Sequence, residues 1–551
     1  MTMPGSPVLG EAEDPRGDLA WGTIPRLLEW ASASFGDAEA VVDGAVRLTF
    51  RQLEVQVDAA ARGFIAAGLE RGDRVALWAP NCVEWIVGAL GALRAGGVIV
   101  TLNTRYKGSE ASFIINESGA RFLLTVRGFL GFDYPSMLED QAVPTLEAIV
   151  LLKGSLEGIN PQGVVTTSLT SLTEGGAVIT NEAMAVRVAT IHPDDVSDLV
   201  FTSGTTGHPK GVMTSHAQTL RTFATWASIV GLREGDRYLI VNPFFHTFGY
   251  KAGLLACLMA GAVAIPEAVF DVDVVLDRIG EEKISMLPGP PTLYQSILQH
   301  PRRNEVDLSS LRLGVTGAAV VPVELVIAMR DELNFETVLT AYGLTESCGV
   351  VTMCRRNDAP ETIATTSGRA IPDLEVRVIG PEGNELSRGE AGEIVARGYP
   401  VMLGYFGLDE ETAKTIDSDG WLHTGDIGTM DEEGNIVITD RLKDMYVVGG
   451  FNAYPAEIEA TLRTVAGVGD IAVIGVPDER MGEVGCAIVV RDGDSTAADT
   501  IFAEELITWA KEKMANYKVP RRIEFVAELP RNPSGKVLKR ALRTQFGSEK
   551  I

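Results

Sequence analysis

A ten-residue segment at 202–211, TSGTTGHPKG, concentrates glycine and hydroxyl side chains directly after the apolar stretch LVF. Glycine lets backbone N–H groups approach a ligand closely, hydroxyls bond oxygen atoms, and a lysine adds positive charge. It is not the loop of P-loop NTPases, in which the lysine directly follows a glycine, because His208 and Pro209 intervene here. The segment still predicts a phosphate cradle, made of Thr202, Ser203, Gly204, Thr205, Thr206, Gly207 and Lys210.

Two later motifs carry residue types that suit a nucleotide. AYGLTES at 341–347 holds an aromatic ring that can stack on a base, a hydroxyl for phosphate and a glutamate oxygen for Mg²⁺. WLHTGD at 421–426 ends in a carboxylate that can accept hydrogen bonds from both ribose hydroxyls. Taken alone, YGLTE is equally typical of a helix start, and TGAA at 316–319 is a common small-residue turn.

Two further segments offer side chains for acid and phosphate chemistry. PFFHTFG at 243–249 places His246 among aromatic residues, where its imidazole could bond a carboxylate substrate. RNPSGKVLKR at 531–540 places Lys536 on a loop, because proline, serine and glycine flank it. The plain alternatives are a structural histidine and a solvated lysine within a basic patch.

Together and in this order, these motifs resemble those of the adenylate-forming superfamily, which includes acyl-CoA synthetases, firefly luciferase-like enzymes and peptide-synthetase adenylation domains. The motifs run from 202 to 536, and the resemblance in architecture covers nearly the whole chain. It implies an AMP-forming acid–thiol ligase. A carboxylic acid and ATP would give acyl-AMP and pyrophosphate, and coenzyme A would then give acyl-CoA and AMP, with Mg²⁺ as the metal.

The resemblance also implies roles for the matching residues. Those expected to bind ATP or AMP are residues 202–207, Lys210, Gly317, Ala318, Ala319, Tyr342, Gly343, Thr345, Asp426 and Arg441. Catalytic roles fall on Lys210, His246, Thr345, Glu346 and Lys536, with Glu346 holding Mg²⁺. Lys443 is the expected hinge, about which the C-terminal domain rotates to withdraw Lys536 and present Gly449 and Gly450 to pantetheine. For Arg441 a surface ion pair is the alternative.

The acyl pocket is expected to be built from 243–255 and the segments around 290–296, 316–319 and 342–350, with Phe245, His246, Gly249, Tyr250 and Lys251 lining it. Residues 249–298 resemble actinobacterial ligases that activate the propanoate side chain of a partly degraded steroid nucleus. The expected substrate is a bulky hydrophobic acid, either a steroid-ring propanoate or a medium- or long-chain fatty acid. Lys251 could pair with a polar substrate group, pair with the pantetheine phosphate, or simply be solvated.

Three rival functions remain open at this point. An acyl-AMP ligase could pass its adenylate to a carrier protein on a separate chain. An amino-acid adenylation enzyme usually carries an aspartate in the pocket helix, and FFHTFG has none. A non-catalytic nucleotide-binding or scaffold protein is expected to lose at least one of the motif residues Lys210, Glu346, Asp426, Arg441 and Lys536, and all five are present.

Composition narrows the class of protein. The 551 residues carry a net charge of −26 with no long basic run, which argues against nucleic acid as a partner. The five cysteines are scattered without a CxxC pair, as in a reducing cytosol, so the expected location is cytoplasmic. The apolar run at 252–265 is shorter than the ~20 residues of a transmembrane helix. A homodimer is left open.

Alternating strand and helix patterns from residue 24 onward predict an α/β fold. The large N-terminal domain should hold parallel or mixed sheets covered by helices. Residues 375–440 should form a small antiparallel β subdomain, because PEGN and EEGN separate short strands as hairpin turns do. The expected divisions are a flexible tail at 1–20, an adenylation domain at 21–440, a hinge at 441–444 and a small, mobile α+β lid domain at 445–551.

Overall fold

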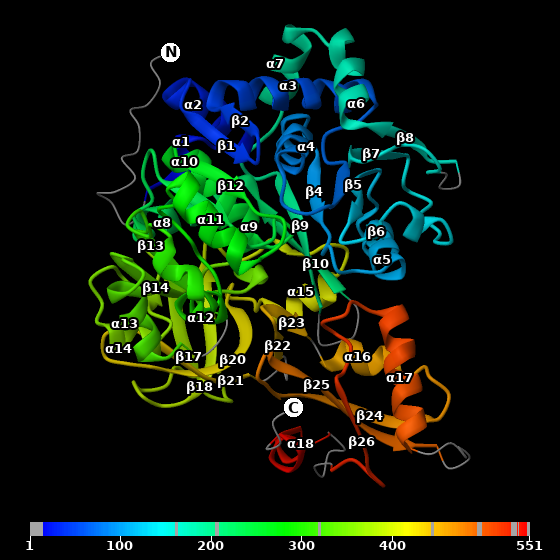
Figure 1. The fold of residues 1–551 in the computed structure, drawn as a ribbon, viewed down its shortest axis with the longest axis vertical. Helices are drawn as coiled ribbons and strands as arrows, with labels where there is room; N and C mark the ends of the chain where they lie inside the picture. Colours follow the sequence, from blue (N-terminus) through cyan, green and yellow to red (C-terminus); the bar gives the residue numbers. More distant parts are fainter. Residues whose placement is uncertain are drawn as a thin grey trace. The chain divides into compact units, whose positions relative to one another are not determined.

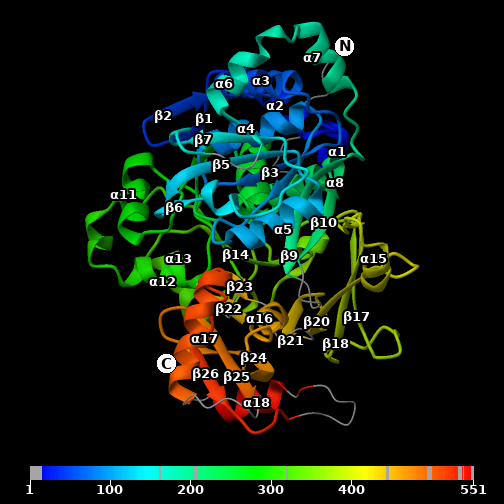
Figure 2. The same ribbon diagram turned by 90° about the vertical axis from the view of Figure 1, so that its right-hand side faces the viewer.

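The computed structural model describes residues 15–159, 163–203, 209–317, 321–441, 446–453, 455–492, 499–530, 537 and 539–547. Internal contacts divide the chain into two compact units, traced from blue to red in Figures 1 and 2. The first unit comprises residues 1–104, 112–201 and 211–439, and the second comprises 105–111, 202–210 and 440–551. Each unit is described here by itself.

The largest sheet of the chain has nine strands and a parallel centre. Its order is β19-β10-β9-β4-β3-β5-β7-β8, with β6 added beside β5. Strands from β9 to β8 in this order all pair in parallel, which confirms the strand–helix–strand alternation predicted from sequence. The strands are β3 (Arg74–Trp78), β4 (Val98–Thr101), β5 (Phe122–Phe129), β6 (Phe132–Asp133), β7 (Ala148–Lys153), β8 (Val165–Ser168), β9 (Val196–Ser203), β10 (Pro209–Ser215) and β19 (Gly404–Tyr405).

Helix α4 (Val83–Arg94) is buried on all sides, because it contacts strands of two different sheets. It touches β3, β4 and β7 of the nine-stranded sheet and β1 of the next, and its neighbour α3 (Phe50–Ala66) covers it further (Figure 1). A helix that is apolar around its whole circumference needs such an environment. Its sequence, VEWIVGALGALR, meets that requirement with small glycines where neighbours approach: a Cβ on Gly91 would lie 2.7 Å from that of Ala60.

A second group of strands carries the segments predicted to bind the acid and the nucleotide. One four-stranded sheet has the order β11-β12-β1-β2, and another has the order β13-β14-β15-β16. Bridges through Met286 link β11 to β13. The strands are β1 (Glu39–Asp43), β2 (Val46–Thr49), β11 (Arg237–Ile240), β12 (Val263–Pro266), β13 (Leu313–Thr316), β14 (Thr337–Tyr342), β15 (Thr352–Met353) and β16 (Arg369–Ala370).

Helices surround these sheets in the first unit. The apolar run at 252–265, too short to cross a membrane, is buried: α10 (Ala256–Ala260) follows a π-helix at Tyr250–Leu255 and leads into β12. The other helices are α1 (Gly17–Ala20), α2 (Ile24–Phe35), α5 (Gly108–Ser118), α6 (Leu169–Gly175), α7 (Asn181–Ala189), α8 (His216–Val230), α9 (Thr247–Gly249), α11 (Val272–Glu282), α12 (Pro291–Gln299), α13 (Val323–Asp331), α14 (Pro360–Thr365) and α15 (Asp409–Thr415).

The predicted antiparallel subdomain is present as a four-stranded sheet of order β17-β18-β20-β21 (Figure 2). β17 (Leu374–Ile379) and β18 (Gly392–Gly398) pair antiparallel, and β18 pairs antiparallel with β20 (Leu422–Met430). β21 (Ile436–Arg441) lies next to β20, and the EEGN turn connects the two. Asn435 closes that turn by donating from its backbone N–H to Asp431 Oδ1 at 2.7 Å.

The second unit has its own hydrophobic core, as expected for a small α+β domain. β22 (Tyr446–Val448), β23 (Phe451–Ala453), β24 (Val468–Asp478), β25 (Gly482–Arg491) and β26 (Arg522–Phe525) form its sheet. α16 (Pro455–Leu462), α17 (Asp499–Lys513) and α18 (Lys539–Phe546) accompany the sheet, and the core takes residues from both kinds of element. Nowhere in the described ranges of the chain is a helix both long and apolar enough to cross a membrane.

Candidate active site

The AYGLTES motif lies where β14 ends and the chain turns sharply back. Thr345–Ser347 form one turn of 3₁₀-helix, and the Gly349 N–H donates to the Leu344 carbonyl at 2.8 Å. Gly343 is required here, because a Cβ at that position would lie 2.2 Å from the Gly349 carbonyl oxygen. The turn therefore sets the backbone positions from which the side chains of Tyr342, Thr345 and Glu346 project.

Tyr342 and Asp426 come together although they belong to different motifs. The Tyr342 hydroxyl donates to Asp426 Oδ2 at 2.7 Å, and both side chains are buried. Asp426 lies on β20, where its N–H donates to Thr424 Oγ1 at 3.1 Å. The structure thus brings together an aromatic ring suited to a base and a carboxylate suited to a ribose.

Glu346 is held from two directions, and one of its partners was not foreseen. Tyr405 Oη donates to Glu346 Oε1 at 2.7 Å, and the Met402 N–H donates to the Glu346 carbonyl at 2.8 Å. Tyr405 lies on β19, which pairs antiparallel with β10 at Val212. Burial, and then the Glu346 carboxylate, raise the pKa of Tyr405, so its hydroxyl remains a donor to the carboxylate at neutral pH. One carboxylate oxygen is thereby oriented by a fixed donor.

The segment predicted to bind the acid is held by Asn81, a second residue that sequence reasoning missed. Asn81 Nδ2 donates to the carbonyls of Ile240 and Asn242 at 3.1 and 2.9 Å, and its Oδ1 accepts from the Phe244 N–H at 2.7 Å. Asn81 follows β3, and a polar residue just after a parallel strand marks the end of a sheet where ligands bind. That position was a usable signal in the sequence.

His246 begins the short helix α9, and its Nδ1 accepts from the Phe248 N–H at 3.2 Å. The imidazole is open to solvent, yet the surrounding protein lowers its pKa by desolvation. With its pKa lowered, the imidazole is neutral at neutral pH. Gly249 has to be glycine, because a Cβ would lie 2.2 Å from the Pro243 carbonyl oxygen.

Two of the other predicted acyl-pocket residues are buried deeply. Tyr250 is 1% exposed and packs against Trp85, with ring centroids 5.7 Å apart. Lys251 is 0% exposed, and its Nζ lies 2.8 Å from Asp198 Oδ1. The alternative of a solvated Lys251 is therefore wrong. Contact of Phe245, His246, Gly249, Tyr250 or Lys251 with the acyl group stays a prediction.

The phosphate loop and two of its partners are described only in part. Thr202 and Ser203 end β9, and Lys210 lies on β10 with 7% of its surface exposed. Gly317 follows β13, where a Cβ would lie 3.2 Å from the Ala341 carbonyl. The side chains of Ser203 and Arg441 lie outside the described part of the chain. So do six further residues predicted to bind the nucleotide, which are Gly204, Thr205, Thr206, Gly207, Ala318 and Ala319.

The elements predicted for the second half-reaction lie in the second unit. Gly449 and Gly450 form the turn between β22 and β23, both in the left-handed region with φ of 54° and 85°. A side chain on Gly449 would also meet Met481 Cε at 2.6 Å. This turn thus requires glycine and leaves bare backbone at its surface. The predicted hinge Lys443 and the predicted catalytic Lys536 lie outside the described residues.

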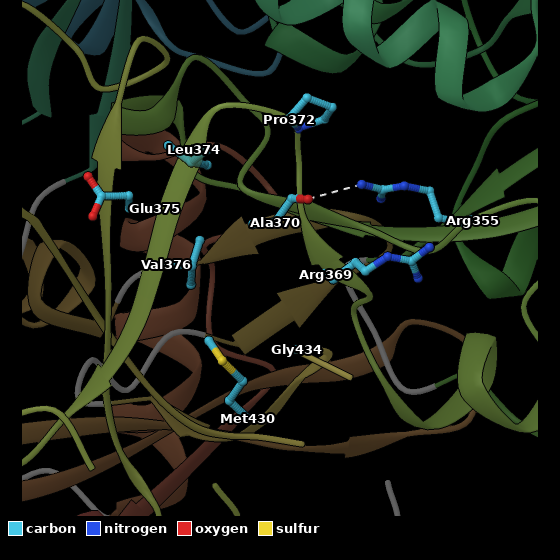
Figure 3. Close-up of a pocket in the computed structure, with 9 residues that line it drawn as sticks. All are labelled: Arg355, Arg369, Ala370, Pro372, Leu374, Glu375, Val376, Met430 and Gly434. Carbon is cyan, nitrogen blue, oxygen red and sulfur yellow. Dashed lines mark hydrogen bonds between the residues drawn. The ribbon is translucent and has the colours of Figure 1, made fainter. Parts of the chain in front are cut away.

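A separate surface cavity of about 540 Å³ lies beside β16 and β17 (Figure 3). Arg355 donates to the Ala370 carbonyl at its wall, at 3.0 Å. Its lining contains no residue predicted to bind nucleotide or acid, so it is not part of the candidate site. The residues that line it are Arg355, Arg369, Ala370, Pro372, Leu374, Glu375, Val376, Met430 and Gly434.

Comparison with known proteins bears on the whole chain. A family model described as "AMP-binding enzyme" matches residues 28–406, and one for the C-terminal domain of AMP-binding enzymes matches residues 457–536. A methyl-dioxo-octahydro-indenyl-propanoyl:CoA ligase of Rhodococcus jostii is 49% identical over 95% of this chain and 98% of its own. The ligase of the same name from Mycobacterium tuberculosis is 47% identical over 95% and 98%.

A solved structure agrees with the fold. o-Succinylbenzoate CoA synthetase (MenE) of Bacillus subtilis, bound to its product analogue OSB-NCoA, aligns with a TM-score of 0.79 and 27% identity. The alignment covers 94% of this chain and 98% of that one. The α/β class and the superfamily resemblance read from the motifs are both confirmed. The chain belongs to the AMP-binding enzyme family.

Proposed function

We propose that the protein is an ATP-dependent acid–thiol ligase that joins a bulky ring-bearing propanoate to coenzyme A. The observation that carries the proposal is 49% identity over 95% of the chain to a ligase named for such a substrate. A saturated octahydroindene with a methyl group and two ketones has the carbon skeleton of the last two rings of a steroid. The substrate class expected from residues 249–298 and the name of this relative therefore agree.

The nucleoside half of ATP would bind at Tyr342 and Asp426. Their hydrogen bond of 2.7 Å orients the carboxylate before ATP arrives, so less entropy is lost when the ribose hydroxyls bind. The Tyr342 ring would stack on the base, with Gly317 and Gly343 offering backbone without side chains beside it. In this proposal Thr345, Lys210 and the 202–207 loop bind the phosphates.

A Mg²⁺ ion bound with ATP fits the oxygen donors present. Glu346 is partly exposed, and only one of its carboxylate oxygens is engaged by Tyr405. In the described residues no group of three or more metal-binding side chains occurs. Mg²⁺ commonly takes one or two carboxylates plus substrate phosphates, so a single glutamate suffices. When bound, the ion would supply positive charge against the phosphates.

The chemical difficulty is to bring two anions, a carboxylate and the α-phosphate, into contact. Lys210 and Lys536 would supply preorganised positive charge where negative charge develops. Neutral His246 would bind or sense the substrate carboxylate without adding a proton, as its lowered pKa requires. No protein nucleophile is needed, because the thiol of coenzyme A attacks the acyl-adenylate itself. The turn at Gly449 and Gly450 would let pantetheine pass close to backbone.

A reducing compartment fits this chemistry, since all five cysteines are free and buried. We place the enzyme in the cytoplasm on that ground.

The test is AMP release from MgATP, with and without coenzyme A, across ring-bearing propanoates, short to long fatty acids, aryl acids and amino acids. Turnover that depends on coenzyme A and is confined to ring-bearing propanoates is the expected result. Adenylate formation without stimulation by coenzyme A would instead indicate transfer to a carrier protein. No reaction with any acid would contradict the proposal.

A further inference from the structure

Lys251 stands at the centre of a buried polar network in the first unit. Its three ammonium protons have three acceptors: Asp198 Oδ1 at 2.8 Å, Thr214 Oγ1 at 2.7 Å and Cys348 Sγ at 3.6 Å. Lys251, Asp198 and Cys348 are all 0% exposed, and Thr214 is 1% exposed. An ammonium can donate three hydrogen bonds, so this one has no capacity left for a substrate.

Each partner of Lys251 belongs to a different functional segment. Asp198 lies on β9, four residues before Thr202, and Thr214 lies on β10, four residues after Lys210. Cys348 directly follows the turn that carries Thr345 and Glu346. Lys251 itself lies on the π-helix that continues the predicted acid-binding segment. One side chain thus joins the two strands of the phosphate loop to the AYGLTES turn.

The network surrounds a single ion pair, Lys251 with Asp198. Asp198 also accepts from Ser197 Oγ at 2.7 Å and from Thr214 Oγ1 at 2.8 Å. Burial alone would lower the pKa of Lys251, but the Asp198 carboxylate outweighs burial and raises it, so the lysine stays protonated. A buried ion pair adds little net stability, because desolvation of each ion costs several kcal/mol. The Lys251–Asp198 pair is therefore better explained by the backbone geometry that it imposes than by its contribution to stability.

The geometry imposed is unusual at Cys348. This residue has φ of 56°, in the left-handed region that non-glycine residues rarely adopt. Two backbone bonds depend on it: the Cys348 N–H donates to the Thr345 carbonyl at 3.0 Å, and the Gly349 N–H donates to the Leu344 carbonyl at 2.8 Å. The Cys348 thiol is anchored by Lys251 on one side and by Thr219 Oγ1, 3.7 Å away, on the other.

We propose that the Lys251–Asp198 pair is a positioning device for the adenylation half-reaction. It holds Cys348 in its left-handed conformation and so fixes Thr345 and Glu346 relative to the strands that carry the phosphate loop. This proposal rests on the proposed function for its catalytic consequence, but its structural claim is independent of any substrate. A misplacement of about 1 Å in such a site can cost ~10²-fold in rate.

The decisive variant is Lys251→Met with Asp198→Asn, which removes both charges and leaves no uncompensated buried ion. Because paired buried charges can be replaced without loss of stability, this protein should fold. Hydrogen exchange of the free protein then reports the turn directly. We expect the amides of Cys348 and Gly349 to exchange at least about tenfold faster, while the strands of the nine-stranded sheet keep their protection. Unchanged exchange at these two amides would overturn the proposal.

The rates of the two half-reactions distinguish a positioning role from a purely structural one, which would not slow the first half-reaction selectively. Pyrophosphate release from acid and ATP should fall ~10- to 100-fold in the double variant. Thioester formation from pre-made acyl-AMP should stay within about threefold of wild type. Equal losses in both half-reactions would contradict a positioning role. If no acid supports turnover, the proposed function fails, and the exchange result still decides this inference.

Two further variants serve as controls. Arg312 and Asp236 form another buried ion pair of the first unit, with side chains 12% and 5% exposed. Arg312→Met with Asp236→Asn should leave exchange at Cys348 and Gly349 unchanged. Cys348→Ala keeps the Lys251–Asp198 pair and removes the thiol that links the pair to the turn, together with the contact of that thiol to Thr219. The Gly349 amide of this variant should also exchange faster than in the wild type. Exchange at the wild-type rate would contradict the link between Lys251 and the turn. This test does not depend on whether the double variant folds.

Discussion

The hydroxyl of Tyr342 lies 2.7 Å from Oδ2 of Asp426, across 84 residues of sequence. Tyr342 ends a strand of one sheet, and Asp426 lies within the antiparallel sheet of β20. The sequence motifs assign the first to the base and the second to the ribose of the same nucleotide. Their direct contact puts the predicted nucleoside site at the junction of these two sheets.

This contact predicts different effects for the two residues. Asp426→Asn should weaken ATP binding about tenfold or more, because an amide has only one oxygen for two ribose hydroxyls and Tyr342. Tyr342→Phe keeps the stacking ring and loses one hydrogen bond, so its effect should be at most about fivefold. Titration calorimetry with a non-hydrolysable ATP analogue measures both. If Asp426→Asn binds the ATP analogue as tightly as the wild type does, the prediction that the Asp426 carboxylate binds the ribose is wrong.

Tyr405→Phe should slow adenylation by about 10-fold, because Glu346 loses the hydrogen bond that the Tyr405 hydroxyl donates to its side chain. The Mg²⁺ concentration for half-maximal rate should rise as well, since the carboxylate loses its orientation. Tyr238→Phe is the matched control: the Tyr238 hydroxyl is buried and has no hydrogen-bond partner among the described residues. Its removal should leave the rate and the Mg²⁺ requirement unchanged. Equal behaviour of the two variants would refute the role of Tyr405.

His216 makes stability depend on pH in the acid range. Complete burial lowers its pKa from 6.5 to about 4, against the partial opposition of Asp198 and Asp195. The unfolded chain binds a proton near pH 6.5 and the folded chain does not, so stability falls as pH drops from about 6.5 to 4 and is unaffected above. The total is about 3 kcal/mol, because each unit of pKa shift is ~1.4 kcal/mol.

His216→Gln checks this, since glutamine can still accept from the Ile24 N–H, which lies 3.3 Å from Nδ1 in the wild type. Urea unfolding from pH 7.5 to 4.5 should show a shallower decline in the variant than in the wild type. Contributions from the carboxylates and the other histidines are common to both proteins and cancel in the difference. Parallel pH profiles would contradict the assignment.

Lys536→Ala should reduce adenylation by ~10²- to 10³-fold, because one preorganised cationic donor to the reacting phosphate is lost. Thioester formation from pre-made acyl-AMP should largely survive. Lys539→Ala is the control in the same stretch of chain, since the Lys539 ammonium already pairs with Glu459 Oε1 at 2.6 Å. Loss of both half-reactions in Lys536→Ala would contradict a role of Lys536 in the first step alone. Loss of either half-reaction in Lys539→Ala would show that the effect is not specific to Lys536.

Patterns local in sequence were enough to predict much of the fold. The strand–helix alternation from residue 24 onward predicted parallel sheets covered by helices, and the nine-stranded sheet has a parallel centre. Turn signals at EEGN correctly placed an antiparallel sheet, because glycine and asparagine favour such turns wherever they occur. The motifs also singled out Tyr342 and Asp426, which the structure brings into contact, while their roles toward a nucleotide stay a prediction.

What local patterns could not predict depends on distant partners. Lys251 reads as a solvated or ligand-binding lysine, and only Asp198, far away in sequence, makes its complete burial tolerable. Tyr405 has no chemical motif of its own, and its role arises from the pairing of β19 with β10. Such contacts follow from sheet order, which a single sequence does not disclose.

The most direct test is the ratio of kcat/KM for a methyl-dioxo-octahydroindene propanoate to that for a linear fatty acid of equal carbon number, measured as acyl-CoA formed. A pocket shaped for fused rings should favour the ring propanoate by ~10²-fold or more, since a misfitting apolar group costs a few kcal/mol. A fatty acid used as well as the ring propanoate, or better, would contradict the account of what this enzyme activates.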